Sequence, residues 1–168
     1  MSQAKVTDFV VTNGAKLYFE RQGIGQALIF IAGSTGDAGN FTRVADLLAD
    51  EFTVVTYDRR GNSRSERPAG WTKTSVSEQA DDAAGIIRAL RLEPAVVFGA
   101  SAGGAIALDL MIRHPFLLRA GILQEPSIFF RVARPHGRSR GTARAHRRHA
   151  QDERPTRNDR GAHALSER

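Results

Sequence analysis

The chain of 168 residues has no cysteine, so it can form neither a disulfide framework nor a thiolate nucleophile. No apolar run approaches the roughly 20 residues that cross a membrane, and residues 1–5 lack the charged-then-apolar pattern of a signal peptide. No cluster of metal-ligand residues and no cofactor motif is visible either. We therefore expect a cytoplasmic protein with no membrane partner, no metal and no cofactor.

Positive charge and apolar residues are distributed unevenly along the chain. The net charge is +6, and residues 131–168 hold 11 of the 24 basic residues but only 4 of the 18 acidic ones. That segment contains one leucine, one valine and no aromatic residue, so it buries too little apolar surface to offset its ordering entropy. The composition predicts a folded domain over residues 1–130 and an Arg-rich disordered tail over residues 131–168.

The abrupt change of composition after Phe130 has three interpretations. We favour an out-of-frame translation, because Arg, Ala, Gly, Pro and His are the residues that GC-rich DNA encodes in a shifted frame. A basic arm that binds nucleic acid non-specifically through its charge is the second interpretation. The tail has no aromatic residue for base stacking, which counts against that partner. The third interpretation is a solvated tail without a partner.

Short apolar runs alternate with helical patterns before that point. Asn13-Gly14 between two alternating segments predicts a hairpin. Continuous apolar runs predict strands that are buried in a parallel sheet, at residues 27–32, 52–57, 95–98 and 120–123. Apolar residues at helical spacing predict helices over 41–48, 76–90 and 103–113. Strands alternating with helices favour a three-layer α/β/α fold with a mostly parallel sheet.

Two local signals refine the positions of these helices and turns. Ser75 with Glu78 three residues later predicts a capping box at the start of the second helix. Pro115 disfavours helix at the residue before it, so the third helix should end near Arg113. Asp58, which follows the run 52–57, is interpreted as part of a hydrogen-bonded turn rather than as a catalytic group.

The pentapeptide 99–103, Gly-Ala-Ser-Ala-Gly, lies between a predicted strand and a predicted helix, as in a nucleophile elbow. A serine nucleophile needs a base and two N–H donors for the oxyanion that its attack creates. Ser101 is the predicted nucleophile, and the backbone N–H groups of Ala102 and Ser34 are the predicted oxyanion donors. A dinucleotide-binding loop is the alternative, but the glycines do not follow the Gly-x-Gly-x-x-Gly spacing.

Four segments of the chain together resemble the N-terminal half of the α/β-hydrolase superfamily, in the branch of small esterases and non-haem haloperoxidase-like proteins. They are Gly33-Ser34-x-Gly36, the stretch 57–63, the pentapeptide with Gly104, and Gln124-Glu125-Pro126. The resemblance implies an eight-stranded sheet, a cap after the sixth strand, and a triad in the order Ser, Asp, His. It also implies a serine hydrolase that acts on small-molecule esters or related acyl compounds.

The tail offers no counterpart for the cap, the last strands or the triad Asp and His. His114 lies at the far end of the helix that follows Ser101, while Glu125 lies at the sheet edge where a carboxylate can orient a histidine. We therefore expect an incomplete α/β-hydrolase fold with impaired activity, which self-associates through an exposed sheet edge. The alternative is a non-catalytic hydrolase-like fragment whose basic tail binds nucleic acid non-specifically.

Overall fold

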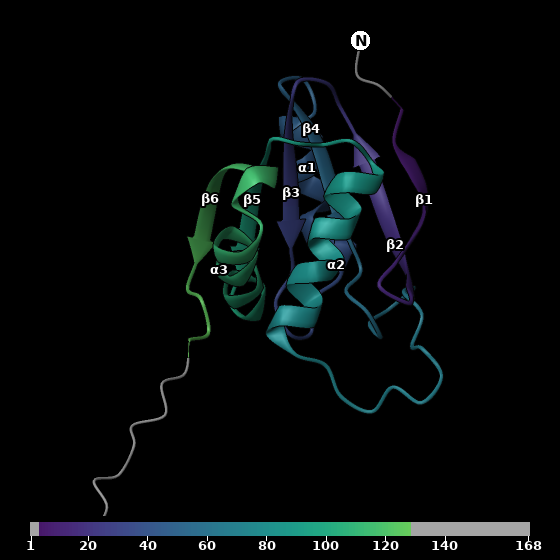
Figure 1. Ribbon diagram of the computed structural model, residues 1–168. Helices are drawn as coiled ribbons and strands as arrows, with labels where there is room; N and C mark the ends of the chain where they lie inside the picture. The colour runs from purple at the N-terminus through teal and green to yellow at the C-terminus, as the bar shows by residue number, and fades with distance from the viewer. Residues whose placement is uncertain (1–3, 129–168) are drawn as a thin grey trace, which may run out of the picture. The chain divides into compact units, whose positions relative to one another are not determined.

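The computed structural model describes residues 4–128, so the predicted domain end at residue 130 and the tail over 131–168 lie outside the described residues. Within residues 4–128 six strands form one sheet in the order β1-β2-β4-β3-β5-β6 (Figure 1). The strands are β1 (Val6–Thr12), β2 (Ala15–Gln22), β3 (Gln26–Ile31), β4 (Phe52–Tyr57), β5 (Ala95–Ala100) and β6 (Leu118–Gln124). The seventh and eighth strands that the resemblance implies fall on no part of residues 4–128.

The sheet is mixed, with a hairpin at one edge. β1 and β2 pair antiparallel around Asn13 and Gly14, whose φ values of 47° and 72° give the left-handed turn that hairpins favour. β2 is antiparallel to β4, while β3 pairs parallel with β4 and β5, and β5 pairs parallel with β6. Both the hairpin and the parallel core of the sheet are confirmed.

Helices cover both faces of the sheet, as the three-layer prediction requires (Figure 1). α1 (Thr42–Leu48), which follows the short helix η1 (Ala38–Phe41), packs on one face, where Leu28 and Phe30 of β3 meet it. α2 (Val76–Ala89) and α3 (Ala102–Arg113) pack on the other face, where Ile29 and Ile31 point. Successive β3 side chains thus alternate between two cores, because a strand has a period of two.

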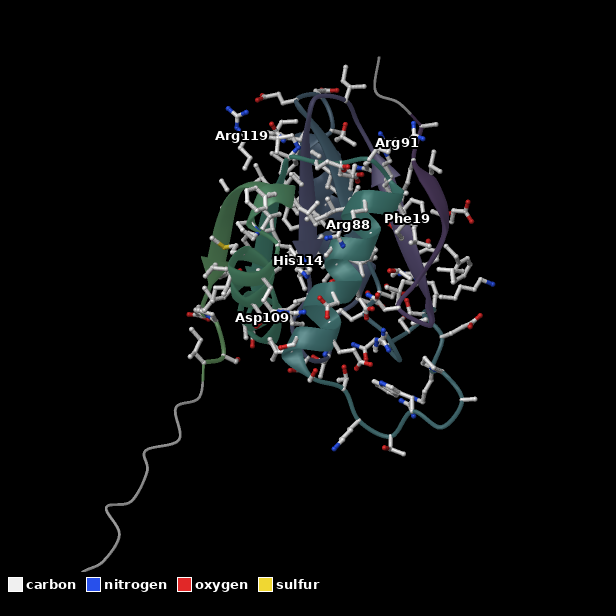
Figure 2. All side chains as sticks on the ribbon, viewed as in Figure 1. Phe19, Arg88, Arg91, Asp109, His114 and Arg119 are labelled. Atoms are coloured by element: carbon white, nitrogen blue, oxygen red, sulfur yellow. The ribbon has the colours of Figure 1, made fainter. Side chains whose placement is uncertain are left out.

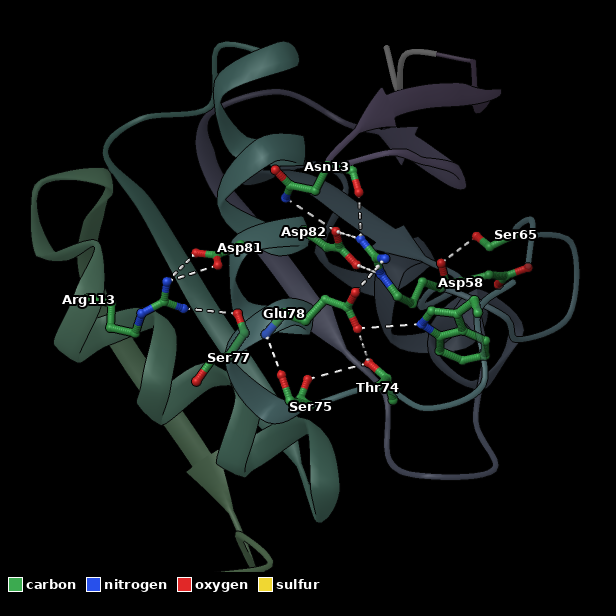
Figure 3. A network of polar contacts seen from close by, with 12 residues as sticks. Asn13, Asp58, Ser65, Thr74, Ser75, Ser77, Glu78, Asp81, Asp82 and Arg113 are labelled. Atoms are coloured by element: carbon green, nitrogen blue, oxygen red, sulfur yellow. Dashed lines mark hydrogen bonds and ion pairs between the residues drawn. The ribbon is translucent and has the colours of Figure 1, made fainter. Parts of the chain in front are cut away.

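The predicted helix boundaries are close to those observed. The Ser75 hydroxyl accepts a hydrogen bond from the Glu78 N–H at 3.0 Å and caps α2. The Glu78 carboxylate accepts instead from Arg60 and from the Thr74 hydroxyl, so only half of the capping box forms (Figure 3). α3 ends at Arg113, and the short helix η2 (Pro115–Leu117) connects it to β6.

Candidate active site

Ser101 occupies the turn between β5 and α3. Its φ of 53° and ψ of −117° lie outside the regions that non-glycine residues favour, which is the strain expected of a sharp strand-to-helix turn. The residue is exposed at the carboxyl end of β5, and its hydroxyl makes no capping hydrogen bond to α3. The hydroxyl is therefore not used to cap the helix.

The glycines around Ser101 allow three backbone segments to approach closely. A Cβ atom on Gly99 would lie 2.3 Å from the Gly103 carbonyl oxygen, and one on Gly103 would lie 2.1 Å from the carbonyl oxygen of Ile31. A Cβ on Gly104 would lie 2.9 Å from Pro126. All three distances are shorter than 3.0 Å, so a side chain at any of these positions would force neighbouring atoms to shift.

The loop after β3 lies against the serine. A Cβ built on Gly33 would lie 3.4 Å from the Cβ and 3.9 Å from the Oγ of Ser101. Ser34 follows in this loop and is exposed, while Ala102 is the first residue of α3. The fold thus brings the loop that carries Ser34 against the turn that carries Ser101 and Ala102. The catalytic roles of these three residues stay predictions.

Arg59 anchors the Ser34 loop through hydrogen bonds, and sequence reasoning did not identify this role. Its Nη2 donates to the carbonyl oxygens of Gly33 and Ser34 at 2.7 and 2.9 Å, and its Nη1 donates to Gln79 at 2.7 Å. Burial lowers the pKa of this guanidinium. The contact follows from the strand pairing: β3 and β4 are parallel neighbours, so residues just past their carboxyl ends meet at one sheet edge.

Asp58 is a buried structural anchor. Its Oδ1 accepts from the Ala38 N–H at 2.8 Å, and its Oδ2 accepts from the Arg64 N–H at 3.0 Å and the Arg64 guanidinium at 2.7 Å. Burial alone would raise the pKa of Asp58, but the hydrogen bonds from Arg64 and Ala38 outweigh it and hold that pKa below its usual value. These contacts agree with the interpretation of Asp58 as part of a hydrogen-bonded turn.

The chain segment that follows β6 contacts Ser101 through Ser127. The Ser127 Oγ lies 3.1 Å from the Ser101 Oγ, and the Ser127 N–H donates to the Ser101 carbonyl oxygen at 3.0 Å. Sequence reasoning did not identify Ser127, since an isolated serine carries no pattern. Glu125 is exposed at the end of β6 with a φ of 44°, and within residues 4–128 its carboxylate forms no ion pair.

Ser101 and His114 lie at opposite ends of α3. Figure 2 shows His114 near Arg88 of α2. At 1.5 Å rise per residue the helix separates Ser101 from His114 by roughly 15–20 Å. The Nε2 of His114 lies 2.7 Å from Asp81, and its Nδ1 lies 3.4 Å from Arg88. Its contacts therefore join α2 to α3 and do not serve Ser101.

A polar hollow of about 290 Å³ opens beside the Ser34 loop. Its lining comes from the loop after β3 and the turn after β4, namely Ser34, Thr35, Gly36, Asp37, Gly61, Asn62 and Ser63. Residues 4–128 contain no group of three or more side chains placed to bind a metal ion. Over the same range, every helix is too short or too polar to cross a membrane.

Comparison with known proteins identifies the class of protein that this fold and this turn define. A profile of the alpha/beta hydrolase fold matches residues 26–151, and the chain belongs to that family. The matched range extends past Phe130 into the Arg-rich segment.

Individual relatives are hydrolases. The uncharacterized hydrolase YraK of Bacillus subtilis is 42% identical over 113 residues, which are 67% of this chain and 42% of YraK. Among solved structures, Est816, described as an N-acyl homoserine lactone degrading enzyme, is 30% identical with a TM-score of 0.67 over 71% of this chain and 45% of its own. E-2-(acetamidomethylene)succinate hydrolase is 28% identical with a TM-score of 0.65, and the match covers 70% of this chain and 43% of that hydrolase. The chain thus spans less than half the length of these proteins.

Proposed function

We propose that the chain carries the nucleophile of a serine hydrolase that acts on esters or related acyl compounds, and that this nucleophile is Ser101. The observation that carries the proposal is the strained, exposed position of Ser101 between β5 and α3, with the Gly33 loop packed against it. The names of Est816 and of E-2-(acetamidomethylene)succinate hydrolase support a small-molecule substrate.

The proposed reaction begins with attack of the Ser101 Oγ on the acyl carbon. The carbonyl oxygen becomes an oxyanion that the N–H groups of Ser34 and Ala102 stabilise, and loss of one such donor costs about 2.7–4 kcal/mol. Collapse of this intermediate, with the Ser101 proton passing to the leaving oxygen, expels the alcohol and leaves an acyl-serine. Water then hydrolyses the acyl-serine, which releases the acid and returns a proton to the Ser101 Oγ.

Proton transfer should limit the rate of this reaction. Within residues 4–128, Ser127 is the side-chain hydrogen-bond partner of the Ser101 hydroxyl, and a hydroxyl is no base at neutral pH. The remaining histidines, His136, His146, His149 and His163, lie outside the described residues. We propose that turnover is impaired, above all at deacylation, because within residues 4–128 no histidine contacts Ser101 to activate the attacking water.

A chromogenic ester tests the proposal. Mixed with a short-chain p-nitrophenyl ester, the full chain should release nitrophenolate in an amount limited by the enzyme and then turn over slowly. Ser101→Ala should abolish this release, and Ser77→Ala, an exposed serine on α2, should leave it unchanged. Equal release from Ser101→Ala and the unaltered chain, or none from a folded unaltered chain, would contradict the proposal.

A further inference from the structure

Arg59 is a buried arginine whose partners in residues 4–128 are all neutral. The residue is 6% exposed, and its guanidinium donates to two consecutive carbonyls of the loop after β3 and to the Gln79 side chain. We propose that Arg59 is a positioning residue that fixes the direction of the Ser34 N–H and so assembles the oxyanion site beside Ser101. This inference rests on the proposed function of Ser101.

The geometry of a trans peptide carries the argument. The C=O and N–H of one peptide unit point in opposite directions, so holding one fixes the other. Arg59 holds the Gly33 C=O at 2.7 Å, and therefore directs the Ser34 N–H away from itself. Its bond to the Ser34 C=O at 2.9 Å fixes the next unit, and with it the Thr35 N–H.

The loop needs such an anchor because glycine makes it easy to flip. Gly33 precedes the Ser34 N–H, and glycine adopts positive and negative φ with similar ease. The Gly36 N–H also donates to the Gly33 carbonyl oxygen, at 3.1 Å, which closes the turn locally. The Arg59 bonds tie this turn to the end of β4, so that the peptide plane is set by the sheet instead of by the loop alone.

The electrostatics of Arg59 differ from those of the arginine beside it. Arg60 is buried to a similar extent, but it forms ion pairs with Asp82 at 2.6 Å and Glu78 at 2.8 Å. Arg59 has no ion-pair partner within residues 4–128, and its Nε is buried without a hydrogen bond. A buried charge without a counter-ion is costly, so this one is poorly suited to stabilising the fold alone.

The uncompensated charge suits the proposed role. A positive group on the Gly33 carbonyl oxygen polarises that peptide unit, which strengthens its N–H as a donor through hydrogen-bond cooperativity. The same N–H is the one that would face the oxyanion. Arg59 thus acts on the transition state through the peptide, without touching substrate.

The first test needs no substitution and no activity. In the full chain, labelled with ¹⁵N and ¹³C, NMR should detect couplings across the hydrogen bonds from the Arg59 guanidinium to the Gly33 and Ser34 carbonyls. Absence of those couplings in spectra that resolve the Arg59 side chain would overturn the inference, whatever the outcome for Ser101.

The second test separates positioning from stability. Arg59→Met should shift and broaden the Ser34 and Thr35 amide resonances and slow phosphonate labelling of Ser101 by about tenfold to a hundredfold. Arg59→Lys retains the charge but lacks the planar set of guanidinium donors. Its labelling rate and amide shifts should lie between those of Arg59→Met and the unaltered chain. The matched control is Ile87→Ala, a buried change in α2 away from the loop, which should lower stability but leave both readouts unaltered.

The outcomes distinguish the two proposals. Unshifted Ser34 and Thr35 resonances in Arg59→Met, or an equal loss of labelling in Ile87→Ala, would overturn the positioning role. If the unaltered chain is never labelled at Ser101, the proposed function fails, while the amide resonances still decide whether Arg59 orients the loop. If Arg59→Met does not fold, Arg59→Lys and the couplings in the unaltered chain decide the question.

Discussion

The turn after β4 concentrates buried charge in a few residues. Asp58 and Arg60 are both buried there, the first bonded to Arg64 and the second to Asp82 and Glu78. Asp81 is paired in turn with Arg113 across α2 and α3 (Figure 3). Hydrogen bonds from Arg113 and His114 hold the pKa of Asp81 below its usual value. The ionised carboxylates therefore help to hold the turn and the helices in place.

Acid should weaken the fold through these groups. The pKa of Asp58 is lower in the folded chain than in the unfolded one, so its stabilisation is complete above its ordinary pKa of about 4 and is lost as the pH falls through its folded value. Urea unfolding between pH 7 and pH 2 should show the free energy of unfolding falling below about pH 4.

Substitution of Asp58 measures how much this residue contributes to the fall of the free energy of unfolding in acid. Asp58→Asn should lower the free energy of unfolding at pH 7 by about 2 kcal/mol and reduce its decline in acid. Asp50→Asn, at an exposed position, serves as the control and should retain the full decline. An acid decline in Asp58→Asn as steep as that of the unaltered chain would refute the assignment.

Two substitutions separate the backbone N–H of Ser34 from its side-chain hydroxyl. Ser34→Pro lacks the N–H and should slow phosphonate labelling of Ser101 by about 10²–10³, whereas Ser34→Ala keeps the N–H and should label normally. Labelling rates measured by intact mass distinguish the two. If both variants label at the same rate, the Ser34 N–H is not an oxyanion donor.

At the scale of elements, continuous apolar runs identified the buried strands, because a strand covered on both faces has no polar side. The run 27–32 corresponds to β3 (Gln26–Ile31), and 52–57 to β4 (Phe52–Tyr57). β6 extends beyond the predicted 120–123 to Leu118–Gln124, since an edge strand also accepts exposed residues such as Arg119.

The contacts around Ser101 were less predictable than the elements that carry them. The strand before Ser101, the turn at Ser101 and the helix after it are formed by residues that are close in sequence. The spacing of apolar residues and glycines therefore predicts them. Arg59 and Ser127 reach the site from other strand ends, and their partners depend on which ends meet in space. A single sequence contains no pattern that reports such contacts directly.

The start of α2 offers a direct test of local structure. Ser75→Ala removes the hydroxyl that caps the Glu78 N–H and should lower the free energy of unfolding by about 1 kcal/mol. Ser77→Ala, two residues further and exposed, should change it by less than about 0.5 kcal/mol. Equal effects in urea unfolding would show that the cap contributes nothing.

On the scale of the whole molecule, β6 forms one edge of the described sheet and bears exposed apolar side chains. Ile122 on this strand is 52% exposed, and Phe116 just before it is 96% exposed. An apolar edge strand is a template for pairing with another chain. Self-association through this edge therefore remains our prediction.

Sedimentation of the full chain at increasing concentration measures that association. Ile122→Lys should shift the chain toward monomer, because a lysine on an edge strand opposes pairing. Val11→Lys on β1, the opposite edge, is the matched control and should not have this effect. A chain that remains monomeric at every concentration, or a response of both variants alike, would contradict the prediction.

The alternative role of the basic segment is also tested on the whole chain. If residues 131–168 bind nucleic acid through charge alone, the chain should be retained on DNA at low salt and released by about 0.2 M. Ser101→Ala should behave identically, since the two functions use different residues. Retention that withstands higher salt would argue against a purely electrostatic contact.

The central claim is that Ser101 is a hydrolase nucleophile, and a phosphonate adduct tests it most directly. The full chain is treated with a serine-directed fluorophosphonate, digested, and the modified residue is identified by mass spectrometry. We predict one adduct, on Ser101, that is absent from Ser101→Ala and retained in Ser77→Ala. An adduct on another residue, or none on a chain that NMR shows to be folded, would contradict the claim.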